Sequence, residues 1–244
     1  MLYSQRDPRF AAYPYSARPP HTETIKSAGC GVCCAASVVS ELAGAEVTPP
    51  EMADYAVQNG YRIDGVGTAN ALFPAVAAEY GLVCTETRSQ IAAEICLSHG
   101  GMIVCGISGG VNRIFSTGGH FFLLVGSEGD KYQFFDPDCY AGKYGLYGRE
   151  KYAELRDGLV YVNKTVAAAE INRYFCFEKE EFQMFPDVKE TDYAYKHIAA
   201  LKKAGIVNGD EQGLFNPAGA LSRRDAAVMI ANALRYAGVL KMEG

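Results

Sequence analysis

The hydrophobic pattern of the chain changes from helical to strand-like near residue 101. Before that point, apolar residues recur at helical spacing in four segments, each bounded by capping residues or glycines. The first segment follows a glycine-flanked turn and ends at Gly44, and the second begins with the capping box Thr48-Pro-Pro-Glu51. The pattern predicts helices over residues 30–42, 49–59, 69–80 and 90–99.

Beyond residue 101 the apolar runs are short and typical of β-strands. They lie at 102–107, 120–126, 131–135, 159–162 and 174–178, with one further helix predicted at 149–157. Because helices come first and strands follow without alternating with them, the order predicts an α+β domain with an antiparallel sheet rather than βαβ units.

The length of 244 residues allows one ordinary domain and a small second one. The formal net charge of -5 gives no basic surface, which argues against nucleic acid as a partner. No apolar run approaches the about 18 residues of a membrane span. The first ten residues, MLYSQRDPRF, contain no signal-peptide core, so we expect export by another route or a signal that was removed.

The eight cysteines are scattered through apolar segments and do not form a disulfide framework. Cys30 and Cys33 make a lone CxxC without a second pair at zinc-ligand spacing, so we expect neither a metal site nor a cofactor. Most of the thiols should be reduced and buried, which suits a cytosol or an anaerobic setting.

Cys30 is a candidate nucleophile because of its position in the chain. Gly29 and Gly31 flank it, and the apolar helix begins directly afterwards. At a helix start, free backbone N–H groups and the helix dipole stabilise a thiolate, which is the nucleophilic form of cysteine. The alternative is a small buried residue without a chemical role, as most free cysteines are.

A cysteine nucleophile needs a base, and His120 is the best placed of the four histidines. It follows a glycine pair and heads an apolar strand, where a side chain can enter a cleft at the sheet edge. The others lie in a proline-rich arm, at a helix end and in the C-terminal segment: His21, His99 and His197.

Asp136 is the candidate orienting group for that base. A three-residue turn at 127–129, with Gly129 in the left-handed region, would place His120 directly opposite Asp136 on one face. A two-residue turn would shift the register by one and separate the two side chains. The alternative role for Asp136 is to end a strand in the pair Asp-Pro.

These motifs together resemble papain-like cysteine peptidases, in particular the leader-cleaving domains of bacteriocin exporters. The resemblance covers residues 1–178 and rests on the order of Gln5, GCG at Cys30, GGHF at His120 and FDPD at Asp136. It implies Cys30 as nucleophile, His120 as general base, Asp136 as orienter and Gln5 as an oxyanion-hole donor beside the backbone N–H of Cys30. An inactive relative that serves as a binding module is the alternative.

The charged segment 179–184 is predicted to be a linker, and residues 185–244 resemble one S-layer homology repeat. The motifs are FPDV, IAALKKAGIVNG, GLFNP and LSRRDAAVMIANAL, with Tyr193 where the family usually has tryptophan. The resemblance implies binding of acidic secondary cell-wall polysaccharide, with Arg223 at a helix start as a partner for anions. Ser222 and Asp225 can also simply cap that helix.

The two parts together predict a cysteine peptidase at the bacterial cell wall, and peptidoglycan peptides are the expected substrate. The protein would be extracellular, for example as a surface hydrolase or a phage lysin released through a holin. The alternatives are an inactive wall-anchored adhesion module and a processor of surface proteins.

One repeat also offers too little apolar surface for an independent core. We therefore expect it either to dock on the peptidase domain or to associate with two other chains in a homotrimer.

Overall fold

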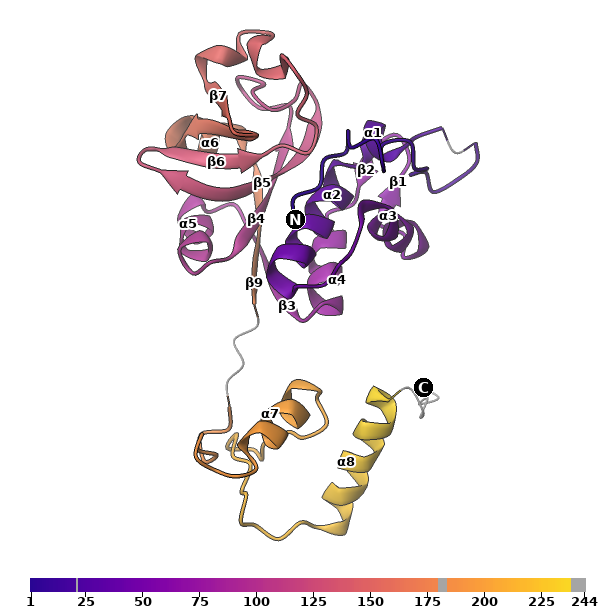
Figure 1. Cartoon of the computed structure of the whole chain (residues 1–244), viewed down its shortest axis with the longest axis vertical. Helices are drawn as coiled ribbons and strands as arrows, with labels where there is room; N and C mark the ends of the chain where they lie inside the picture. Colours follow the sequence, from indigo (N-terminus) through magenta and orange to yellow (C-terminus); the bar gives the residue numbers. More distant parts are fainter. Residues whose placement is uncertain (21, 180–183, 238–244) are drawn as a thin grey trace. The chain divides into compact units, whose positions relative to one another are not determined.

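A computed structural model describes residues 1–20, 22–179 and 184–237 of the chain, and Figure 1 shows its elements. The chain divides into two compact units, Met1–Glu180 and Glu181–Gly244. His21 and most of the segment predicted as a linker, 179–184, lie outside the described residues. Within the described ranges, no helix is both long enough and apolar enough to cross a membrane.

Five α-helices of the first unit precede most of its strands, as the sequence predicted. They are α1 (Ile25–Ala28), α2 (Cys30–Val38), α3 (Pro49–Gln58), α4 (Leu72–Glu79) and α5 (Gln90–Ser98). The predicted capping box is present, because the backbone N–H of Thr48 donates to the Glu51 carboxylate at 2.8 Å. Helix α2 continues through a π-helical turn, Val39–Ala43, to Gly44, whose φ of 68° is the left-handed ending expected there.

The prediction of a helix start at residue 69 was wrong. Residues 67 and 68 form the short strand β2 (Gly67–Thr68), which pairs with β1 (Arg62–Ile63), and α4 begins only at Leu72. Thr68 therefore belongs to a small hairpin next to α2. A potential cap residue in the sequence does not reveal such a pairing, because the hairpin is stabilised by contacts with residues elsewhere in the chain.

The main sheet of the first unit has seven strands in the order β3-β9-β4-β5-β6-β8-β7, and every neighbouring pair is antiparallel. The strands are β3 (Leu82–Thr87), β4 (Met102–Ser108), β5 (Gly119–Glu128), β6 (Lys131–Phe135), β7 (Ala153–Arg156), β8 (Leu159–Asn163) and β9 (Arg173–Lys179). The predicted α+β class with an antiparallel sheet is confirmed.

The helix predicted at 149–157 is absent from the structure. A 3₁₀ turn, Arg149–Lys151, leads there into the edge strand β7, which pairs with β8. The helix that does form on this side is α6 (Lys164–Glu170), capped by the Asn163 side chain. The strand forms in place of the predicted helix because its backbone groups hydrogen-bond with β8. This is a tertiary contact, which local propensity does not include.

Two hydrophobic clusters cover the two faces of the sheet. Helices α2, α3 and α4 pack on one face with strand residues such as Val104 and Phe175, and α5 and α6 contribute to the cluster on the other face with Cys105 and Phe122. Neighbouring strand residues enter opposite clusters because successive side chains alternate across a sheet. Helix α2 is the centre of the first cluster, because every residue from Gly31 to Val38 is buried.

The β5–β6 hairpin differs from the predicted one. Gly129 has a positive φ of 57°, as expected, but Glu128 pairs with Lys131, so the turn has two residues rather than three. Farther along, Leu124 pairs with Phe134 while Gly126 pairs with Gln133, which leaves Val125 as a one-residue bulge. The bulge shifts the register by one residue and returns the side chains of His120 and Asp136 to the same face.

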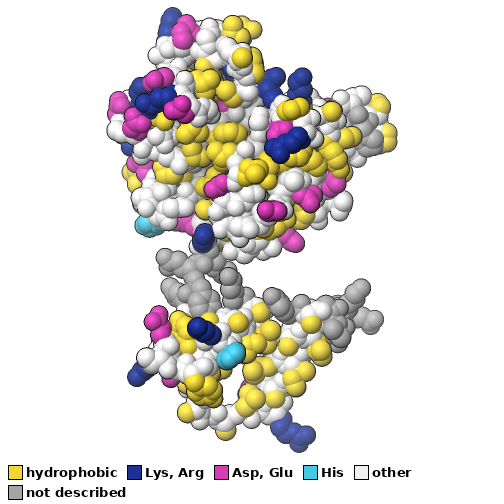
Figure 2. Space-filling model, in the orientation of Figure 1, with side chains coloured by type: hydrophobic (Ala, Val, Ile, Leu, Met, Phe, Trp, Pro, Cys, Tyr) yellow, Lys and Arg dark blue, Asp and Glu magenta, His cyan; other side chains and the backbone are white. Residues whose placement is uncertain are grey.

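The second unit contains α7 (Tyr195–Lys203) and α8 (Arg223–Tyr236) around a small core. Its buried apolar residues are Phe185, Val188, Ile198 and Val207. On α8, by contrast, Val228 is 53% and Ile230 61% exposed. Figure 2 shows the many hydrophobic side chains on the visible surface of this unit.

Candidate active site

Cys30 is the first residue of α2, as its glycine-flanked position predicted. At both flanking positions there is no room for a side chain, which explains why they are glycines. A Cβ on Gly29 would lie 2.5 Å from the Ile25 carbonyl oxygen, and one on Gly31 would lie 2.6 Å from Thr68. The β1–β2 hairpin therefore comes into close contact with the helix start, and Cys30 remains half-buried at the edge of a cleft.

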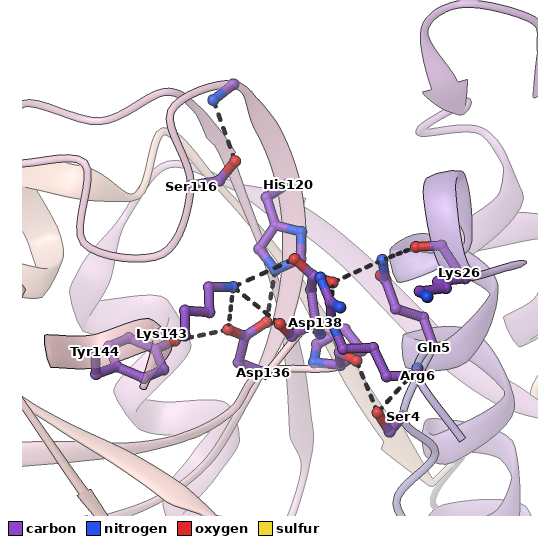
Figure 3. A network of polar contacts seen from close by, with 12 residues as sticks. Ser4, Gln5, Arg6, Lys26, Ser116, His120, Asp136, Asp138, Lys143 and Tyr144 are labelled. Carbon is purple, nitrogen blue, oxygen red and sulfur yellow. Dashed lines mark hydrogen bonds and ion pairs between the residues drawn. The ribbon is translucent and has the colours of Figure 1, made fainter. Parts of the chain in front are cut away.

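His120 lies at the start of β5, opposite Ile107 on β4, and is buried. Its imidazole Nε2–H donates to Asp136 Oδ1 at 2.7 Å, as Figure 3 shows. His120 and Cys30 line the same cleft, and each shifts the pKa of the other. The structure thus brings together the three residues that the sequence singled out, from α2, β5 and the end of β6.

Asp136 accepts four hydrogen bonds in a fully buried position (Figure 3). His120 Nε2 and the Asp138 backbone N–H share Oδ1, at 2.7 and 2.9 Å. Lys143 Nζ and Tyr144 Oη donate to Oδ2, at 2.6 and 2.7 Å. The carboxylate is therefore fixed in one orientation and accepts from all its partners as an anion.

Lys143 and Tyr144 were not among the residues that the sequence singled out. They lie on a 3₁₀ turn, Lys143–Gly145, seven and eight residues after Asp136. The Lys143 side chain is only 3% exposed. The only sequence signal was a lysine and a tyrosine between glycines, which is typical of any surface loop.

The electrostatics of the site favour a thiolate–imidazolium pair. Burial opposes the charge on Asp136, but His120 and Lys143 hold the pKa of this carboxyl well below its usual range. Burial also disfavours the imidazolium, yet Asp136 and Cys30 raise the pKa of His120 to about 9. Burial raises the pKa of the Cys30 thiol, and the hydrogen bond and charge of His120 outweigh this, so that its pKa lies below its usual value.

In this state the site is a row of four alternating charges: Cys30 negative, His120 positive, Asp136 negative and Lys143 positive. Their sum is zero, which matters because an unpaired charge in the interior is costly. The two cysteines that follow on the same helix behave differently, because burial raises the pKa of Cys33 and Cys34 well above the ordinary value.

Gln5, predicted as an oxyanion donor, lies close to this row but its amide is engaged. Nε2 donates to the Lys26 carbonyl at 2.7 Å and to Asp138 Oδ1 at 3.1 Å, as Figure 3 shows. An amide nitrogen has two hydrogens, so both are used. The donor role stays a prediction, and it requires Gln5 to release one of these partners.

Cys30 and His120 open into a cleft of about 580 Å³. Its walls come from the β1–β2 hairpin, from β4 and from the start of β9, and they include Thr68, Gly106 and Arg173. Among the described residues, no group of three or more His, Cys, Asp or Glu side chains has a geometry that would hold a metal ion.

In the second unit, neither residue predicted to bind the wall lines the groove that this unit contains. Tyr193 is 99% exposed, and Arg223 is an exposed first residue of α8. A separate groove of about 540 Å³ contains Asp210, Asn216 and Asp225 instead. The predicted cap is confirmed, because Ser222 Oγ accepts from the Asp225 backbone N–H at 3.1 Å.

Two comparisons with known proteins give matches to parts of this chain. Residues 185–227 match the S-layer homology domain family. Among solved structures, the chain is similar to the peptidase domain of Streptococcus ComA, a bifunctional ABC transporter involved in a quorum-sensing pathway. The identity is 15% and the TM-score 0.42, over 62% of this chain and 92% of that domain. No curated protein matches the sequence.

Proposed function

We propose that the first unit is a cysteine peptidase with Cys30 as nucleophile, His120 as acid and base, and Asp136 as the orienter of His120. The observation that carries this proposal is the geometry of the site: Cys30 at the start of α2 and His120 line one cleft, and His120 is hydrogen-bonded to the buried Asp136. The lowered pKa of Cys30 favours the nucleophilic thiolate, and the raised pKa of His120 keeps a proton ready for the leaving group.

In the proposed reaction, Cys30 Sγ attacks the peptide carbonyl carbon, and the carbonyl oxygen becomes an oxyanion. The Cys30 backbone N–H, at the start of α2, lies where such charge is stabilised. His120 gives its proton to the leaving amine, the C–N bond breaks and a thioester remains. Water then attacks the thioester while His120 takes its proton, and the Cys30 thiolate leaves.

We further propose that the substrate lies in the bacterial cell wall. S-layer homology domains associate proteins with the cell surface by binding wall polysaccharide, and residues 185–227 match that family. Such an anchor would hold the cleft beside peptidoglycan, whose peptides are then the nearest substrates. A surface hydrolase and a phage lysin would both act from this position.

The test is incubation of the full chain with purified cell walls under reducing conditions, followed by mass spectrometry of the released fragments. We expect new peptide termini with the natural sequence and none with Cys30→Ala. Cys84→Ala is the matched control, because Cys84 is also half-buried but lies outside the cleft. Equal release by Cys30→Ala and the natural chain would refute the nucleophile.

A second candidate is an inactive wall-binding module. It draws support from Gln5, whose amide hydrogens are both occupied in the structure. The same experiment separates the two functions, because such a module would sediment with the walls and release no fragments. A third outcome, cleavage of extracted surface proteins without cleavage of peptidoglycan, would indicate a processor of surface proteins.

A further inference from the structure

Two arginines line the cleft at the end of the β3–β9 ladder. The β3–β9 ladder ends with Thr87 opposite Tyr174. Arg88 directly follows β3 and Arg173 is the first residue of β9, and both line the cleft that contains Cys30 and His120. Two like charges that line one cleft repel each other, so this pair has no evident benefit for folding.

Little in the surroundings offsets these two charges. Arg173 Nη1 contacts Glu86 Oε1 at 2.8 Å, but the Glu86 side chain is 49% exposed and lies outside the cleft lining. Arg88 is exposed and has no hydrogen-bond or ion-pair partner in the described part of the chain. Two guanidinium groups therefore line the cleft, and Glu86 is the one carboxylate of the described residues that pairs with either of them.

The rest of the cleft lining is neutral or apolar apart from the Cys30–His120 pair. It includes Asn70 and Asn172, and the Asn172 amide already donates to Ser108 Oγ at 2.9 Å. No aspartate or glutamate of the described residues lines the cleft. A guanidinium binds a carboxylate through two parallel N–H bonds, which gives both charge and geometric selection.

We infer that Arg88 and Arg173 form a subsite for a carboxylate of the substrate, so that the enzyme selects peptides with an acidic group close to the scissile bond. The inference that acidic peptides are selected for cleavage rests on the proposed peptidase function. Binding of a carboxylate by the two arginines does not require that function. In the free protein Glu86 forms an ion pair with Arg173, and a bound substrate carboxylate has to replace part of this contact.

The experiment uses dye-labelled octapeptides of alanine and glycine with one glutamate moved through every position, each matched by a glutamine peptide. Binding to full-length Cys30→Ala is measured by fluorescence anisotropy at low salt, where contacts between exposed charges are not screened. Cleavage of the same peptides by the natural sequence is measured in parallel.

At the preferred position, we expect glutamate to bind about tenfold more tightly than glutamine, as one charge-assisted contact allows. In the Cys30→Ala background, Arg88→Gln and Arg173→Gln should each bring this ratio close to one. Glu86→Gln should increase it, because a competitor is removed. Arg156→Gln is the matched control, since Arg156 is exposed, pairs with Glu128 and lies on β7 at the far edge of the sheet.

Equal binding of glutamate and glutamine peptides at every position, or no binding at all, would overturn the subsite. So would a preference that survives in the double variant Arg88→Gln/Arg173→Gln. The outcome is separate from that of the proposed function. A glutamate preference without any cleavage supports the subsite and contradicts the peptidase function. Cleavage without a glutamate preference supports the peptidase function and contradicts the subsite.

Discussion

Replacing Lys143 by methionine tests whether the active site depends on its balance of charges. Methionine keeps an unbranched stem of similar length but removes the ammonium group, which lies 2.6 Å from Asp136 Oδ2. The substitution leaves Asp136 with three donors and leaves the buried row with one unpaired negative charge. Tyr144→Phe is the matched control, because it removes a neutral donor, 2.7 Å away, from the same oxygen.

The two variants should differ clearly in stability. Breaking a buried ion pair by removing one partner costs about 3–5 kcal/mol. Removing a neutral hydrogen bond that leaves three others in place costs about 1 kcal/mol. We therefore expect Lys143→Met to lower the free energy of unfolding by about 2–4 kcal/mol more than Tyr144→Phe does. The double variant Asp136→Asn/Lys143→Met should recover part of the loss, because neither charge is then left unpaired.

Urea unfolding followed by far-ultraviolet circular dichroism measures these differences, since the sequence contains no tryptophan to report by fluorescence. A second measurement separates charge from packing. Deleting a positive charge makes protonation of neighbouring groups easier, so the pH at which Cys30 becomes a thiolate should rise in Lys143→Met. The rate of alkylation by iodoacetamide as a function of pH reports this shift. Equal stability losses in the two single variants, together with an unchanged alkylation profile, would refute the charge-balance argument.

Three further predictions follow from the site and from the second unit. Limiting iodoacetamide at mildly acidic pH should label Cys30 first, because its pKa is lowered, and mass spectrometry showing equal labelling of several cysteines would contradict this. Peptide hydrolysis should decline as the pH rises through about 9, because His120 is protonated below its pKa and neutral above it; kcat/KM that stays level to higher pH would count against this acid. The exposed Val228 and Ile230 favour self-association, so sedimentation equilibrium should show a trimer for the full chain and a monomer for a chain ending at residue 180, whereas monomers in both cases would end the trimer hypothesis.

The sequence by itself determined the local features of this protein. Glycines on both sides of Cys30 and an apolar run after it predicted a helix that begins at this residue, and α2 does so. The glycine pair before His120 and the apolar run after it predicted a strand, which is β5. Such features are visible in a sequence because periodicity, caps and glycines act over a few neighbouring residues.

Only the tertiary structure decided how these elements meet. The two-residue turn at Gly129 alone would have placed the side chains of His120 and Asp136 on opposite faces of the sheet. The bulge at Val125 returns them to the same face. A bulge of this kind is set by the packing of both strand faces, so a count along the chain does not reveal it.

The charges around the site depend on the fold in the same way. Lys143 becomes a partner of Asp136 only because its turn is buried against the end of β6, and burial gives that contact its strength. Arg88 and Arg173 are 85 positions apart in the sequence and come to line the same cleft only when β3 pairs with β9. Contacts between distant residues depend on strand order and register, and these are properties of the assembled sheet rather than of any segment of it.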